Sequence, residues 1–148
     1  MPSITLTHTA NGPLITVGIL PSLPRQQALK AAGVAVPQIT SGTFLVDTGA
    51  SSTVVDASLI TPLGLTPTGV AMCHTPSTGQ AALPFNQYDV MLFIPGTAPG
   101  QIPWIIEALP IMECDLSAQG IQGLIGRDML DRAVLIYNGS SKHFTISY

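Results

Sequence analysis

FLVDTGASST, residues 44–53, is the most informative stretch of the chain. Its first three residues are apolar and predict a buried strand that leads Asp47 directly into a turn made by Thr48 and Gly49. A carboxylate at the end of a buried strand costs free energy unless it is paired or used in a reaction. Glycine lets the backbone turn sharply and lets another segment approach closely. Asp47 is therefore the first candidate catalytic residue, with the alternative that it only accepts hydrogen bonds from turn amides.

A second informative segment, GLIGRDML, spans residues 123–130. It places two bulky apolar residues, Leu124 and Ile125, before Gly126 and a predicted short helix. Leu124 and Ile125 are predicted core residues whatever the function. Between these two segments, residues 86–90 read NQYDV, on a predicted strand.

These three segments, in this order, resemble those of single-domain, retropepsin-like (retroviral-type) aspartic proteases of the bacterial kind. The resemblance covers the chain in character from about residue 44 to its end, and the first forty or so residues match less distinctively. It implies an all-β fold, a closed β-barrel-like structure with one or two short helices. It also implies a homodimeric aspartic endopeptidase, a hydrolase that cleaves extended peptide or protein substrates.

The same resemblance implies roles for particular residues. Asp47, Thr48 and Gly49 would form the catalytic turn, with the Thr48 hydroxyl hydrogen-bonded across the dimer axis. The NQYDV segment is similar to the strand that leaves the flap in retroviral proteases, which places the flap tip near Thr78 and Gly79. These two residues fit an ordinary hairpin tip as well. Substrate would contact Ala50, Thr78 and Gly79, and the catalytic turn would be supported by Leu124, Ile125 and Gly126.

One position departs from the retroviral pattern. Retroviral enzymes place an acid four residues after the catalytic Asp, where it pairs with the Arg that follows the glycine. This chain has Ser51 at that position. Arg127 must therefore have another partner or another role.

The chain contains a single Asp-Thr-Gly triplet. Aspartic protease chemistry needs two neighbouring carboxylates, because one must be ionised and the other protonated around a shared water. A two-fold homodimer supplies the pair by bringing Asp47 of each copy to the axis. No second catalytic turn can form at the other aspartates, which are Asp56, Asp89, Asp115, Asp128 and Asp131.

Length and composition agree with this interpretation. A chain of 148 residues predicts one domain, residues 1–148. Fourteen Gly and thirteen Pro predict many turns and few long helices. Because only 9% of the residues are charged, we expect a buried subunit interface, to which the apolar C-terminal segment 133–148 contributes. The absence of a basic run argues against a nucleic-acid partner.

Hydrophobic patterning and turn signals predict the elements. A hairpin is expected from residues 4–8 and 14–20, joined by Asn11-Gly12-Pro13, followed by a short helix at 24–33. Two arms, 66–75 and 80–94, are expected to form the flap, and Pro110 interrupts or ends a strand at 104–112. The remaining predictions are a strand at 42–46, a helical turn at 56–62, a surface loop at 95–103, a strand at 121–125, a short helix at 127–132 and a closing hairpin from 134–137 and 144–148.

No cofactor or metal is expected. Cys73 and Cys114 are too few for a disulfide framework, and Cys73-His74 is more typical of a loop pair than of a metal site. The N-terminal residues lack the basic region of a secretory signal, and no stretch approaches the length that spans a bilayer. A cytoplasmic protein without a membrane partner is therefore expected.

A second function is compatible with the same fold. The chain could serve as a dimeric peptide- or protein-binding module that cleaves little or nothing. The intact Asp-Thr-Gly triplet favours catalysis, because a scaffold has no need of a paired acid.

Overall fold

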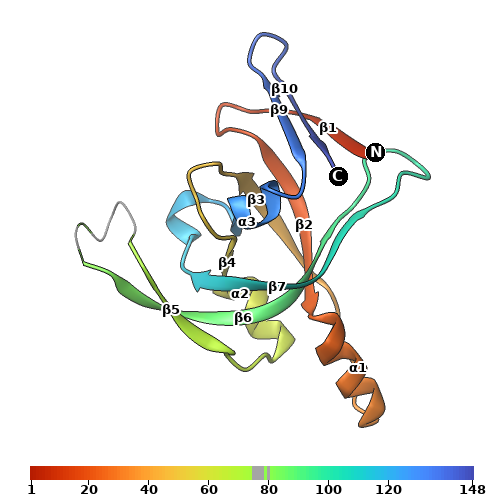
Figure 1. Cartoon of the computed structure of the whole chain (residues 1–148), viewed down its shortest axis with the longest axis vertical. Coiled ribbons are helices and arrows are strands. Elements are labelled where there is room, and N and C mark those ends of the chain that lie inside the picture. Colours follow the sequence, from red (N-terminus) through yellow and green to blue (C-terminus); the bar gives the residue numbers. More distant parts are fainter. Residues whose placement is uncertain (75–78, 80) are drawn as a thin grey trace.

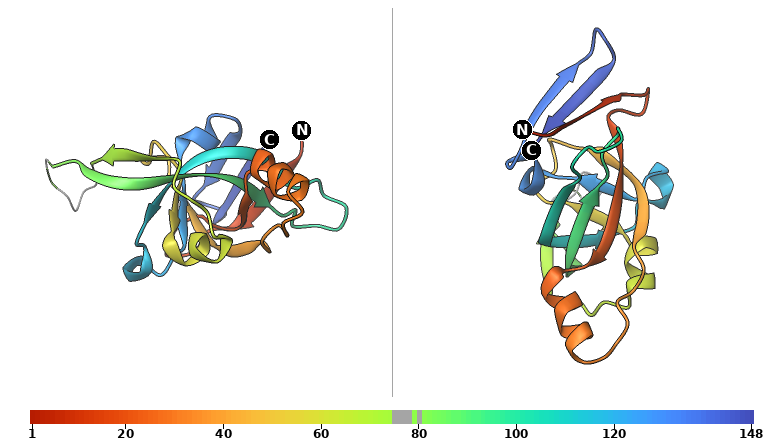
Figure 2. Two further views of the ribbon diagram at one scale, coloured as in Figure 1. Left: turned by 90° about the horizontal axis from the view of Figure 1, so that it is seen from below. Right: turned by 90° about the vertical axis from the view of Figure 1, so that its right-hand side faces the viewer.

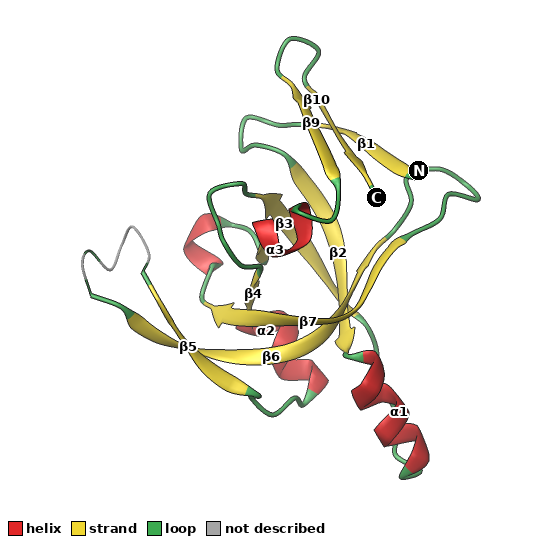
Figure 3. Ribbon diagram, viewed as in Figure 1, coloured by secondary structure: helices red, strands yellow, loops and turns green. Residues whose placement is uncertain are grey.

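The computed structural model describes residues 1–74, 79 and 81–148. Within them the chain is mostly β-structure with a few short helices, as Figure 3 shows, so the all-β prediction is confirmed. The helices are α1 (Leu23–Ala31), α2 (Ala57–Ile60) and α3 (Arg127–Leu130), with 3-10 turns at Thr61–Leu63 and Ser117–Gln119. The strands are β1 (Ser3–Thr7), β2 (Leu14–Pro21), β3 (Thr40–Val46), β4 (Val54–Asp56), β5 (Gly69–Cys73), β6 (Leu83–Ile94), β7 (Trp104–Cys114), β8 (Gly123–Ile125), β9 (Val134–Asn138) and β10 (His143–Ser147).

Six strands close into a barrel. Their order is β2-β3-β8-β4-β7-β6, and β6 also pairs with β2, which completes the ring. Closure leaves these strands without a free edge over the paired residues. Among the residues described, β5 has β6 as its one partner, and the two strands project together beyond the barrel (Figures 1 and 2). A separate sheet, in the order β1-β10-β9, lies at the end of the molecule where both termini meet (Figure 1).

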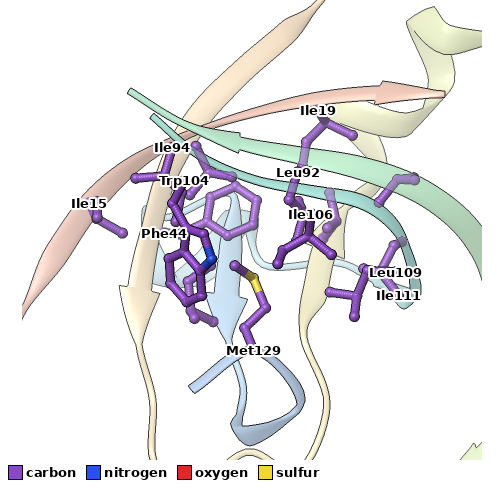
Figure 4. Packing of buried hydrophobic residues seen from close by; sticks show 14 of the residues in the cluster. Ile15, Ile19, Phe44, Leu92, Ile94, Trp104, Ile106, Leu109, Ile111 and Met129 are labelled. Carbon is purple, nitrogen blue, oxygen red and sulfur yellow. The ribbon is translucent and has the colours of Figure 1, made fainter. Parts of the chain in front are cut away.

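The barrel interior is filled by apolar side chains from almost every element. Phe44, Trp104 and Met129, from β3, β7 and α3, lie together in this interior (Figure 4). Gly123 lets Phe44 pack directly on β8, since a Cβ at Gly123 would lie 2.1 Å from the Phe44 ring. Full burial of side chains of this size stabilises a fold by about 1.5–3 kcal/mol each. The core therefore holds β3, the strand that leads into Asp47, through Phe44 and Val46 on its buried face.

The expected hairpin of residues 4–8 and 14–20 is wrong. A tight turn does form, with reciprocal backbone hydrogen bonds of 3.0 Å between Thr9 and Gly12. Beyond this turn the strands diverge, because β1 pairs with β10 while β2 enters the barrel beside β3 and β6. The turn residues specify a local reversal of the chain, but the long-range partner of each strand depends on where its apolar face is buried.

Two smaller expectations are refined. α1 carries no buried residue and stands off the barrel (Figure 1), with Pro24 in its first turn and Gly33 at φ +70° after its end. β7 continues through Pro110 instead of ending there. β4 pairs with β7 at residues 112–114 and β6 pairs with it at Pro110. On the edge of β7 that faces away from β6, no paired strand has reached Pro110 within the described residues, so the N–H that proline lacks is not needed there.

Asp56 caps α2 from a buried position. Its Oδ1 accepts a hydrogen bond from the Ser58 N–H at 3.0 Å, and its Oδ2 accepts one from the Leu116 N–H at 2.7 Å. Burial alone raises the pKa of this carboxyl, but the hydrogen bonds from Ser58 and Leu116 outweigh burial and hold the pKa below its ordinary value. The charged form of Asp56 therefore ties α2 to the loop before β8.

This arrangement predicts how stability depends on pH. Because the folded-state pKa of Asp56 is lowered, its contribution is present above the unfolded-state pKa of about 3.9 and is lost as the pH falls through the folded-state value. Asp56→Asn should therefore lower the free energy of unfolding at pH 7, and the difference from wild type should shrink below about pH 4. Urea unfolding of both proteins from pH 7 to pH 3 measures this difference. A difference that stays constant over that range would contradict the assignment.

Candidate functional site

The Asp47 turn is enclosed by three strands. β3 leads into the turn and β4 leads out of it, while β8 runs between them, parallel to β3 and antiparallel to β4. Leu124 lies opposite both Leu45 and Val54. The structure thus brings Leu124 and Ile125 beside the strand that carries Asp47, as the sequence suggested.

Asp47 itself is half-buried and is held by backbone hydrogen bonds. Its N–H donates to the Ile125 carbonyl at 3.0 Å, and its carbonyl accepts from the Ala50 N–H at 3.3 Å. Its Oδ1 accepts from the Gly49 N–H at 2.8 Å. Thr48 and Gly49 are exposed at the tip of the turn, and Ala50 is half-buried. The carboxylate is therefore oriented by the turn and remains accessible.

Gly126 is placed where the turn leaves no room for a side chain. A Cβ at Gly126 would lie 2.4 Å from the Ser52 carbonyl carbon and 2.8 Å from the Thr53 nitrogen. These are backbone atoms, which cannot move aside as a flexible side chain could. Its φ of −88° is ordinary, so the requirement for glycine is one of space.

The sequence did not reveal a second support of the turn, formed by Thr53 and Asp128. Asp128 accepts hydrogen bonds from the Thr53 N–H at 2.8 Å and from the Thr53 hydroxyl at 2.7 Å. The Gly126 N–H in turn donates to the Thr53 hydroxyl oxygen at 3.2 Å. Thr53 is fully buried, so these bonds satisfy polar groups that water cannot reach. The signal available in sequence, an Asp in the first turn of a helix, does not identify a partner 75 residues away.

Arg127 has a partner in its own chain despite the serine at position 51. Its Nη1 donates to the carbonyl oxygens of Thr48 at 2.8 Å and Gly49 at 3.3 Å. Its backbone N–H donates to the Ala50 carbonyl at 2.9 Å. The guanidinium therefore binds the outside of the Asp47 turn directly, where the retroviral pattern would pair it with an acid.

The expected flap corresponds to the β5–β6 hairpin. Gly69 lies opposite Gln87 and Cys73 opposite Leu83, so β5 pairs over its full length with the first residues of β6. Gly79 has φ +62°, a conformation that favours glycine, and a Cβ there would meet no atom within 4 Å. Thr78 lies outside the described residues. Gly79 thus lies in the connection between β5 and β6.

Other kinds of site receive little support in the described part of the chain. Among residues 1–74, 79 and 81–148, no three His, Cys, Asp or Glu side chains are grouped so that they could hold a metal ion. In the same residues, no helix is long and apolar enough to span a bilayer. A hollow of about 440 Å³ lies between α1 and the segment before β5, and its lining includes Arg25 and Asp89 but not Asp47.

Comparisons with known proteins agree with this geometry. A family model described as "Aspartyl protease" matches residues 32–129. Among solved structures, a retropepsin-like aspartic protease from Rickettsia conorii is similar to this chain with a TM-score of 0.58 and 14% sequence identity, over 99% of this chain and 90% of that one. A search of curated proteins found no match. The expected retropepsin-like fold is therefore confirmed.

Proposed function

This chain belongs to the aspartyl protease family, and from that premise we propose that it is a homodimeric endopeptidase whose two copies each contribute Asp47 to one catalytic pair. The observation that carries the proposal is the Asp47 turn, in which an accessible carboxylate is held by the Gly49 N–H and buttressed by Arg127 and Asp128. One retropepsin-like domain, residues 1–148, would form each half of the enzyme.

In the proposed reaction, the two Asp47 carboxyl groups share one proton and one water. The ionised group removes a proton from the water as the water oxygen attacks the scissile carbonyl carbon. The protonated group donates its proton to the carbonyl oxygen, which gives a tetrahedral intermediate. When the C–N bond breaks, the protonated carboxyl group gives its proton to the leaving amine, and the ionised one takes a proton from a hydroxyl of the intermediate, which restores the shared-proton state. No cofactor or metal takes part.

The neighbouring residues would position these groups. The Gly49 N–H fixes the Asp47 carboxylate at 2.8 Å, and the exposed Thr48 side chain is free to hydrogen-bond the same residue of the second copy. Arg127 restrains the carbonyls of Thr48 and Gly49 from behind. A displacement of the turn by about 1 Å would cost much of the rate, because such reactions depend on close alignment.

The substrate would be an extended peptide. Such a peptide binds as an added strand, with main-chain hydrogen bonds that supply affinity and side-chain pockets that supply specificity. We place it between the Asp47 turn, with Ala50 beside it, and the β5–β6 hairpin, whose tip at Thr78 and Gly79 would close over it. Closure of a flap excludes water and holds the scissile bond in place.

The alternative is a dimer that binds peptide through the same contacts but does not cleave it. Incubation with a reduced and alkylated protein, with and without pepstatin, separates the two functions. A protease generates new amino termini that pepstatin suppresses, and these are counted by mass spectrometry. Binding of peptide without new termini at any pH from 3 to 7 would instead favour the binding module.

A further inference from the structure

β9 ends the three-stranded sheet β1-β10-β9, so one of its edges has no neighbouring strand in the described part of the chain. The backbone groups on that edge follow from the pairing of β10 with β1. The His8 N–H donates to the Lys142 carbonyl, and the Tyr148 N–H donates to the Pro2 carbonyl, at 3.0 Å each. These two bonds flank the paired residues of β1 and β10, so the backbone groups of the even-numbered β10 residues point toward β1. Since hydrogen-bonding direction alternates along a strand, Thr145 then bonds Ile136. The N–H and C=O groups of Leu135 and Tyr137 therefore point to the free edge.

This edge lacks the devices that usually prevent strand addition. Residues 133–138 read AVLIYN and contain no charge and no proline. Val134, Ile136 and Tyr137 are 49%, 56% and 55% exposed. The opposite edge differs, because on β1 the Ser3 carbonyl already accepts a hydrogen bond from the Gln101 side chain. β9 is thus the edge of this sheet that is prepared for another strand.

The edge is also rigidly connected to the Asp47 turn. α3 carries Arg127 and Asp128, which bind the turn, and β9 begins four residues after α3 ends. Met129, between these two residues and β9, is fully buried in the core. In Figure 1, β9 is the strand of the small sheet on the side of the β3–β4 loop, which contains Asp47. A second copy bound at β9 would therefore be held in a fixed position relative to the turn.

We propose that two copies of this chain pair antiparallel through β9, with Ile136 at the two-fold axis, so that their small sheets join into one sheet of six strands. The occupant is a second copy because one chain has a single Asp-Thr-Gly, so this inference rests on the proposed function. The N–H and C=O groups of Leu135 form hydrogen bonds with those of Tyr137 in the second copy. By the two-fold symmetry, Tyr137 of the first copy pairs in the same way with Leu135 of the second. Each Ile136 lies opposite its own symmetry mate.

Cross-linking tests the register. In antiparallel strands, directly opposite Cβ atoms are about 4.5–5.5 Å apart and closest in pairs without mutual hydrogen bonds, which is the kind of pair formed by the two Ile136 residues. Ile136→Cys, in a background with Cys73→Ser and Cys114→Ser, should therefore form a covalent dimer with oxidised glutathione. Two thiols lose two protons and two electrons to form the disulfide, and the oxidant becomes two glutathione molecules. Thr5→Cys, in the middle of the other edge strand β1, is the matched control and should stay monomeric on a non-reducing gel.

A charge at the axis tests the interface without a new bond. Ile136→Lys puts two ammonium groups opposite each other and should raise the dimer dissociation constant at least about tenfold, measured by sedimentation. Thr5→Lys should leave the constant unchanged, and circular dichroism checks that both variants fold. A wild-type monomer at all concentrations, an unaffected dimer in Ile136→Lys, or preferential cross-linking at Thr5→Cys would overturn the inference. A dimer that cross-links through position 136 but never cleaves peptide would overturn the proposed protease while the interface stands.

Discussion

Asp47→Asn should fold and dimerise like the wild-type protein and lose at least about a thousandfold in kcat/KM on any peptide that the wild type cleaves. Asparagine is nearly isosteric with aspartate, and its Oδ1 can still accept the hydrogen bond from the Gly49 N–H. It cannot accept a proton from the attacking water or hold the proton that the pair must share. The loss should therefore appear in kcat, with little change in the free energy of unfolding.

The matched control for this substitution is Asp89→Asn. Asp89 is an exposed acid on β6, opposite Pro110. Its replacement by asparagine is the same chemical change, made away from the Asp47 turn. It should keep wild-type activity. Pepstatin-sensitive cleavage by well-purified Asp47→Asn protein at a rate near that of the control would refute the assignment of Asp47.

Gly126→Ala adds a single methyl group and should lower both the activity and the stability of the protein. Its Cβ would lie 2.4 Å from the Ser52 carbonyl carbon, so either β8 or the Asp47 turn must move. Overpacking of this kind typically costs about 1–3 kcal/mol of stability. Because a shift of about 1 Å near a reacting group can cost on the order of a hundredfold in rate, activity should fall more than stability. Thermal unfolding and peptide cleavage, measured on the same preparation, give the two effects.

Gly139→Ala provides the comparison. Gly139 does not have a positive φ, and a Cβ there would meet only the Tyr137 ring at 3.8 Å, which is ordinary contact. The free energy of unfolding should change by less than about 0.5 kcal/mol, as for most surface substitutions. If Gly126→Ala behaved like Gly139→Ala in both assays, the close approach of Gly126 to Ser52 would not matter for the turn.

Much of the candidate site was readable from local sequence. FLVDTGA predicted the strand, the acid at its end and the turn, and GLIG predicted the short strand β8 that lies beside it. Those signals are strong because they depend on neighbouring residues: apolar runs favour strands, and small residues favour sharp turns. The arms of the β5–β6 hairpin were predicted for the same reason.

The predictions that failed or were missing concern partners distant in sequence. Asn11-Gly12-Pro13 does turn the chain, yet β1 pairs with β10, about 140 residues away, because Ile4 and Leu6 share an apolar face with Phe144 and Ile146. The turn chemistry is identical for either pairing, so it cannot select one.

The residues of this chain thus specify its strands, its turns and the single acid at the end of β3 through short-range backbone preferences and apolar periodicity. The partners of Arg127 and of Asp128 were set by barrel closure, which inserts β8 between β3 and β4 and brings α3 against the turn. From the sequence alone, the guanidinium of Arg127 could donate to any of many acceptors, and the hydroxyl of a buried Thr53 could have any of many hydrogen-bond partners. Packing of the core around Phe44 and Met129 selects one arrangement, because buried polar groups must find their hydrogen-bond partners wherever the apolar side chains place them.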